Sequence, residues 1–124
     1  MDSNLERRVY IRFRCGGRAA LHKFADDLVY PAKILEVSAG GCLLDVDDVT
    51  VAESLEVGVI VEVAFKVSGE SFRVSAEVRS RRSGTVIGFR FDQLSSRTTA
   101  RLRELVQGLE RNCKDAQQAR AAQE

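Results

Sequence analysis

The residues best suited to bind an anionic ligand lie near the N-terminus, in the sequence Glu-Arg-Arg-Val-Tyr-Ile-Arg-Phe-Arg. Arg8 and Arg12 are four positions apart there, and Arg7 directly precedes the first of them. A guanidinium binds phosphate through two parallel hydrogen bonds and stacks on nucleobase faces, so a few arginines suit a nucleotide. The Arg-x-x-x-Arg spacing occurs three times among the fifteen arginines of the chain, so it is weak evidence alone. Taken alone, this arm is best interpreted as a basic terminus in water.

A second candidate is the segment Glu-Val-Ser-Ala-Gly-Gly that begins at Glu36 and ends at Gly41. The carboxylate of Glu36 and the hydroxyl of Ser38 can form hydrogen bonds with the edge of a purine, and glycines permit a close approach of the ligand. In isolation, the segment also fits an ordinary hairpin turn between two strands.

The other polar residues offer no convincing catalytic site. Any Ser-His-Asp or Cys-His set would need His22, the single histidine, and no serine lies in a nucleophile-elbow pattern. His22 is therefore expected to be a structural or surface residue. The adjacent acids Asp26-Asp27 and Asp47-Asp48 are expected in solvated turns rather than as acid–base pairs. The sequence favours a binding protein over an enzyme, with no cofactor.

Length, cysteine usage and hydropathy narrow the class further. The 124 residues fit one compact domain. Cys15, Cys42 and Cys113 are odd in number and far apart, which favours isolated thiols over a zinc site. No apolar run is long enough for a membrane span, and the N-terminus lacks a signal region, so a cytoplasmic protein is expected.

The candidate residues must be positioned by short strands. Phe72–Arg79 alternates apolar and polar residues at period two, and Val59–Val67 repeats that pattern before a Ser-Gly-Glu turn, which predicts an antiparallel hairpin. The other expected strands are Arg18–Phe24, Ala32–Val37, Cys42–Val46 and Thr85–Phe91. Six short strands with no helix between them favour an antiparallel barrel or sandwich, with Val61, Val74 and Phe89 buried.

The composition changes after Leu94. Ser95 and Ser96 are good N-caps, and apolar residues follow at helical spacing, so an amphipathic helix should pack on the barrel. The apolar positions are Leu102, Leu105, Val106 and Leu109. The expected organisation is one domain over 1–112, with an arm (1–17), a barrel (18–94) and a helix (95–112), followed by a solvated helical or frayed tail (113–124).

Charge is unevenly distributed along the chain. The total is only +1, but residues 1–24 carry six basic and two acidic side chains, and residues 36–64 carry seven acids and no Lys or Arg. The arm is therefore a candidate anion site, and the middle of the chain is not. The neutral total and the lack of an aromatic stripe interleaved with Lys and Arg disfavour a barrel that binds single-stranded nucleic acid.

In this order, the arginine arm, the acid-x-Ser-x-x-Gly turn, the closing strand Ile87–Phe91 and the helix resemble the PilZ domain, from Arg7 to about Leu109. The resemblance implies an all-β fold, namely a six-stranded antiparallel β-barrel of PilZ type with a C-terminal α-helix packed on it. It also implies a bacterial, non-catalytic receptor for the second messenger cyclic di-GMP, with a role in motility or biofilm regulation.

The resemblance also assigns roles to individual residues. Arg8 and Arg12 match the family's arginines that bind phosphate and guanine, and Ser38 and Gly41 match the Ser and Gly of its Asp/Asn-x-Ser-x-x-Gly motif. Arg7 occupies a position that goes with an intercalated ligand dimer. Glu36 departs from the pattern, because the family has Asp or Asn there, and its extra methylene weakens the expected contact with guanine.

Two functions follow as alternatives. In the first, a stand-alone domain binds cyclic di-GMP, its mobile arm closes over the ligand, and the remodelled surface signals to an effector protein. In the second, a degenerate PilZ-like adaptor binds no nucleotide and acts by protein contact in pilus or motility regulation. A monomer or weak homodimer is expected, with no nucleic-acid partner and no membrane span.

Overall fold

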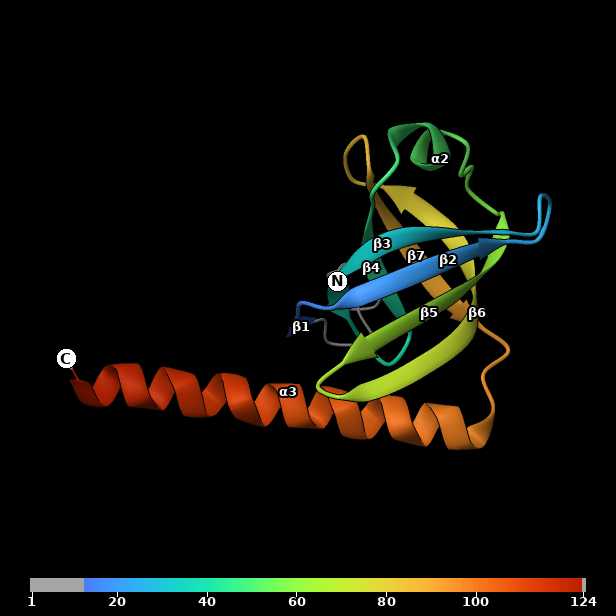
Figure 1. The fold of residues 1–124 in the computed structure, drawn as a ribbon. Coiled ribbons are helices and arrows are strands. Elements are labelled where there is room, and N and C mark those ends of the chain that lie inside the picture. The colour runs from blue at the N-terminus through green and yellow to red at the C-terminus, as the bar shows by residue number, and fades with distance from the viewer. Residues whose placement is uncertain (1–12, 124) are drawn as a thin grey trace, which may run out of the picture.

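The computed structural model describes residues 13–123, and side chains are described for residues 15–110. Six antiparallel strands close into a barrel in the order β3-β2-β5-β6-β7-β4, because β4 pairs with both β7 and β3. The two-residue strand β1 pairs with the end of β3 (Figure 1). The strands are β1 (Phe13–Arg14), β2 (Arg18–Lys23), β3 (Leu28–Val37), β4 (Gly41–Val46), β5 (Ile60–Val67), β6 (Glu70–Arg81) and β7 (Val86–Asp92). The expected all-β barrel with one C-terminal helix is confirmed.

Alternating burial drives the pairing of β5 with β6. Inward residues of both strands are buried and outward ones are more exposed, as the period-two pattern predicted. Val63 pairs with Val74 in the centre of this hairpin, and the turn contains Ser68 and Gly69, both with positive φ. The sequence predicted that Val61, Val74 and Phe89 are buried, and this is confirmed by their exposures of 0%, 4% and 4%.

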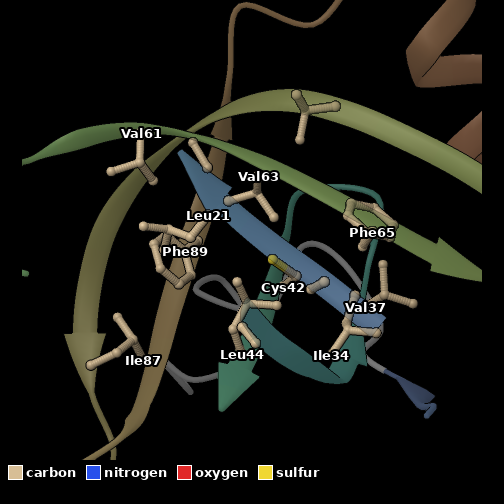
Figure 2. Packing of buried hydrophobic residues seen from close by; sticks show 14 of the residues in the cluster. Leu21, Ile34, Val37, Cys42, Leu44, Val61, Val63, Phe65, Ile87 and Phe89 are labelled. Carbon is tan, nitrogen blue, oxygen red and sulfur yellow. The ribbon is translucent and has the colours of Figure 1, made fainter. Parts of the chain in front are cut away.

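The inner faces of the strands form one hydrophobic core (Figure 2). Leu21, Ile34, Leu44, Val63 and Ile87 are fully buried, although they come from five different strands. Each large aliphatic side chain buried in this way contributes about 1.5–3 kcal/mol through loss of apolar surface from water. This shared core holds the strand ends, and thus the candidate site, in a fixed arrangement.

The expectation of no helix between the strands is wrong. A short helix, α2 (Val49–Glu53), lies between β4 and β5 and covers one end of the barrel (Figure 1). Asp48 caps it, with its carboxylate accepting hydrogen bonds from the N–H groups of Thr50 at 2.8 Å and Val51 at 3.3 Å. Burial of Val51 and Ala52 in the core stabilises this turn despite its β-branched sequence. The strand order is unaffected.

Strand β3 is longer than the pattern indicated, because it includes Pro31. The expected strand began at Ala32, and proline lacks the N–H that a central ladder position needs. Pro31 pairs with Ala20 of β2, and its carbonyl oxygen accepts a hydrogen bond from Asp47 on the opposite side at 3.2 Å. The ladder between β3 and β4 begins only at Ala32, so the missing N–H interrupts neither ladder.

The C-terminal helix α3 (Ser96–Gln123) crosses the end of the barrel opposite α2 (Figure 1). Ser95 caps it by accepting a hydrogen bond from the N–H of Thr98 at 3.1 Å. Leu102 is fully buried and Leu105 is 7% exposed, which confirms the expected packing on the barrel. Arg101 fastens the helix to the β5–β6 hairpin, since it donates to the carbonyl oxygen of Ser71 at 2.9 Å and lies 4.5 Å from the centre of the Phe72 ring.

Candidate functional site

The serine of the candidate turn holds the turn together. Ser38 lies just after β3, is only 5% exposed and is the one buried polar residue among the described side chains. Its hydroxyl oxygen accepts hydrogen bonds from the N–H groups of Gly40 at 3.1 Å and Gly41 at 3.0 Å, and the hydroxyl donates to the carbonyl oxygen of Gly41 at 3.3 Å. The Ser38 N–H donates to the same carbonyl at 2.9 Å. Ser38 therefore fixes the backbone of the turn.

The glycines of the turn lie against strand β7. A Cβ atom at Gly41 would come within 2.2 Å of the Phe89 carbonyl oxygen, so no side chain fits there. The Gly40 carbonyl oxygen accepts a hydrogen bond from the Phe91 N–H at 2.9 Å. These contacts join the turn to the barrel wall and require glycine at position 41 for packing reasons.

Glu36 lies at the end of β3, beside an irregularity in the β3–β4 register between Ile34 and Glu36. Its Cα partners are Leu43 of β4 and Arg14 of β1. Glu36 is partly exposed, two residues before Ser38. Burial, together with the nearby charge of Glu36, raises the pKa of the Cys15 thiol to about 11. The carboxylate, the turn and Cys15 therefore share one end of the barrel.

The arginines of the arm, Arg7, Arg8 and Arg12, lie outside the described residues. Immediately after Arg12, strand β1 begins at Phe13, whose Cα partner is Val37, the residue before Ser38. Consecutive Cα atoms are about 3.8 Å apart, so the described chain starts close to the turn. Helix α3 also contacts β1.

A charged cluster on β6 and β7, not anticipated from the sequence, lies next to the same turn. Arg79 Nη1 donates to Glu77 Oε2 at 2.9 Å, and Arg90 Nη2 donates to Glu77 Oε1 at 3.4 Å. The hydrogen bond from Arg79, with the charges of Arg90 and Arg79, lowers the pKa of Glu77 below its usual value. The cluster lies beside the turn because the β4–β7 register pairs Gly41 with Arg90, which is about fifty positions later in the chain. No local sequence pattern shows this pairing.

The remaining polar residues hold loops rather than a reaction centre. His22 Nε2 lies 2.7 Å from Asp27 Oδ1 in the exposed β2–β3 turn. Tyr30 donates to Asp26 at 2.6 Å, and this hydrogen bond lowers the pKa of Asp26. Within the described residues, no three metal-ligating side chains gather and no helix is long and apolar enough to cross a membrane.

The described cysteines are not joined to each other. Cys15 is half-buried and Cys42 is buried, and both are free thiols. Burial is the main cause that raises the pKa of Cys42, with a smaller contribution from Cys15. Both side chains are therefore protonated at neutral pH and are poor nucleophiles and metal ligands there.

The closed antiparallel barrel has a serine-built turn at one end, a helix across that end and a short strand beside the turn, and these features define a small β-barrel domain. The family model described as "PilZ domain" matches residues 6–108, from the arginine arm to the C-terminal helix. The chain therefore belongs to the PilZ domain family.

Solved structures share this fold at low sequence identity. The PilZ domain with c-di-GMP of YcgR from Escherichia coli is similar with a TM-score of 0.68 and 20% identity, over 90% of this chain and 98% of that one. The structure of YcgR in complex with c-di-GMP, from the same organism, has a TM-score of 0.75 and 20% identity, over 91% of this chain and 50% of that one. The MrkH–c-di-GMP complex of K. pneumonia has a TM-score of 0.72 and 15% identity, over 89% of this chain and 55% of that one. The chain thus spans about half of YcgR and MrkH. No match to a curated protein was found.

Proposed function

We propose that this chain binds cyclic di-GMP at the end of the barrel formed by the Ser38 turn, and that it acts as a receptor and not as an enzyme. The observation that carries the proposal is that one family match includes both the arginine arm and the Ser38 turn. Residues 6–108 include the arginine arm, and β1 brings the chain that follows Arg12 to within one residue of Ser38 in the register. Solved PilZ domains with the same fold contain c-di-GMP.

In the proposed complex, Arg8 and Arg12 bind the phosphates and a guanine face, because guanidinium groups suit both. The rigid Ser38–Gly41 turn gives a side-chain-poor surface on which a base can lie, and Glu36 meets the guanine edge. Arg7 supports a stack of two intercalated ligand molecules. No catalytic role or cofactor is assigned to any of these residues.

The proposed signalling relies on the contact between β1 and α3. Ligand that binds the arginines fixes the arm on the barrel, and β1, which contacts α3, carries the change to the helix. The remodelled arm and α3 then present a new surface to an effector protein. We propose that the domain works in this way in the cytoplasm of a bacterium, as a monomer or weak homodimer.

One specific observation favours a second candidate, a PilZ-like adaptor without nucleotide. Glu36 is a methylene longer than the family's Asp or Asn, so its carboxylate oxygens stand farther from the strand than the motif requires. A buried hydrogen bond lost in this way costs about 1–3 kcal/mol, which is roughly a tenfold to hundredfold loss of affinity. In that case the barrel acts by protein contact alone.

Isothermal titration of cyclic di-GMP into the native chain, Arg8→Ala and Glu36→Asp separates these functions. The receptor proposal expects micromolar or tighter binding that Arg8→Ala abolishes, with about two ligands per protein if Arg7 supports a stacked dimer. No binding by the native chain, with binding gained by Glu36→Asp, contradicts the receptor proposal and supports the adaptor.

A further inference from the structure

One side chain on the barrel wall lies beside the candidate turn, on the side opposite β1. Arg90 of β7 stands between two residues that contact the turn's glycines. Before it, the Phe89 carbonyl oxygen is the atom that a Cβ at Gly41 would meet, and after it the Phe91 N–H donates to Gly40. Arg90 is itself the Cα partner of Gly41.

The Arg90 side chain points outward from the barrel. Phe89 and Phe91 are 4% and 8% exposed and point into the core, and side chains alternate along a strand. The Arg90 side chain is 58% exposed. Gly41, the Cα partner of Arg90, has no side chain that could lie against the guanidinium.

The charge around Arg90 leaves it available to an anion. Two guanidinium groups, those of Arg79 and Arg90, share the single carboxylate of Glu77, so this cluster carries a net positive charge. Arg79 makes the shorter contact, 2.9 Å against 3.4 Å for Arg90. Long, exposed ion pairs contribute little to stability, so Arg90 can exchange Glu77 for a phosphate at small cost.

We infer that Arg90 is a further ligand-binding residue of the Ser38 turn site. Its guanidinium contacts a phosphate, or stacks on a guanine, of the bound cyclic dinucleotide from the barrel wall. Glu77 is a positioning residue that pairs with Arg90 when no ligand is bound and competes with the ligand for it. This inference rests on the proposed binding of cyclic di-GMP and names a contact that the sequence motifs do not include.

The test is titration of cyclic di-GMP into four variants beside the native chain. Arg90→Ala removes the contact, Arg90→Lys keeps the charge but not the planar group, and Glu77→Gln removes the competitor. Arg73→Ala is the matched control, because Arg73 makes a similar exposed ion pair, 3.5 Å from Glu62, on the β5–β6 wall. Thermal unfolding of each variant confirms that it is folded.

Opposite effects of two neighbouring substitutions are expected. Arg90→Ala weakens binding about tenfold to a hundredfold, since a hydrogen bond to a charged group is lost. Arg90→Lys binds more tightly than Arg90→Ala and less tightly than the native chain. Glu77→Gln tightens binding by up to about fivefold, with a steeper salt dependence. Arg73→Ala leaves the affinity unchanged.

Two results overturn the inference, and they are distinguishable. If the native chain binds and Arg90→Ala binds equally well, Arg90 makes no contact although the proposed function stands. If the native chain does not bind cyclic di-GMP, the proposed function fails and the inference fails with it.

Discussion

Removal of the Ser38 hydroxyl tests whether this motif residue builds the turn. In Ser38→Ala, the N–H groups of Gly40 and Gly41 lose their acceptor, at 3.1 Å and 3.0 Å in the native turn. The Gly41 carbonyl oxygen keeps the hydrogen bond from the Ser38 N–H at 2.9 Å, so its loss of the long hydroxyl bond matters little. Two lost hydrogen bonds at about 1 kcal/mol each give a destabilisation of about 2 kcal/mol.

Urea unfolding measures this loss. For m values of about 1–3 kcal/mol per molar, the expected destabilisation lowers the midpoint of Ser38→Ala by roughly 1 M. Ser83→Ala, an exposed serine on the β6–β7 turn, is the control and should stay within about 0.5 kcal/mol of the native chain. A Ser38→Ala midpoint equal to that of the control would refute a structural role for the hydroxyl.

Three further outcomes are expected. Gly41→Ala lowers the free energy of unfolding by about 1–3 kcal/mol in urea titration, because its Cβ would lie 2.2 Å from the backbone oxygen of Phe89, which cannot move aside alone. Leu102→Ala lowers it by about 2–5 kcal/mol in the same assay, because it opens a cavity under α3, where Leu102 is fully buried. The Cys15 thiol reacts slowly with a thiol reagent at pH 8 and faster as the pH approaches its pKa of about 11, followed by peptide mass spectrometry.

Each of these has its own control. Gly84→Ala places a Cβ where no atom lies within 4 Å, so it should leave stability unchanged or slightly raised. Leu109→Ala removes a partly buried residue and should cost less than Leu102→Ala. Urea should bring Cys15 to the reactivity of an exposed thiol at pH 8. Fast labelling of Cys15 in the folded protein, or equal costs within either pair of substitutions, contradicts the packing described here.

The raised pKa of Cys15 also fixes the sign of a pH effect. Between the ordinary value of 9.0 and about 11, the unfolded chain loses the thiol proton while the folded chain retains it. The unfolded state binds fewer protons in this window, so the contribution of Cys15 to stability falls as the pH rises. Cys15→Ser should remove that part of the pH dependence.

The strands were predictable where their alternation is set by one buried and one exposed face. The β5–β6 hairpin followed from the sequence because inward residues such as Val63 and Val74 recur at period two. Two features depend on tertiary contacts instead. Helix α2 has β-branched residues and forms because Val51 and Ala52 are buried in the barrel end, and Pro31 is accepted in β3 because its ladder position needs no N–H.

The candidate site also has features that the local sequence predicts and features that depend on contacts between distant strands. The turn that contains Ser38 and Gly41 was predictable because it is local, and its role in binding stays a prediction. The reason for Gly41 was not visible, since it comes from the Phe89 carbonyl across the sheet. Arg90 and Glu77 have no sequence signal, because a register between distant strands places them. Roles for Arg7, Arg8 and Arg12 remain predictions, as these residues lie outside the described part of the chain.

The most direct test of cyclic di-GMP binding at the Ser38 turn is an amide NMR titration of the labelled chain. Saturating ligand should shift the amide signals of Glu36, Ser38, Gly41 and Arg90 most, because they surround the proposed site. Signals of the β2–β3 turn around Asp27, remote in the register, should change little. No shift at Ser38 and Gly41, or the largest shifts near Asp27, would contradict the account.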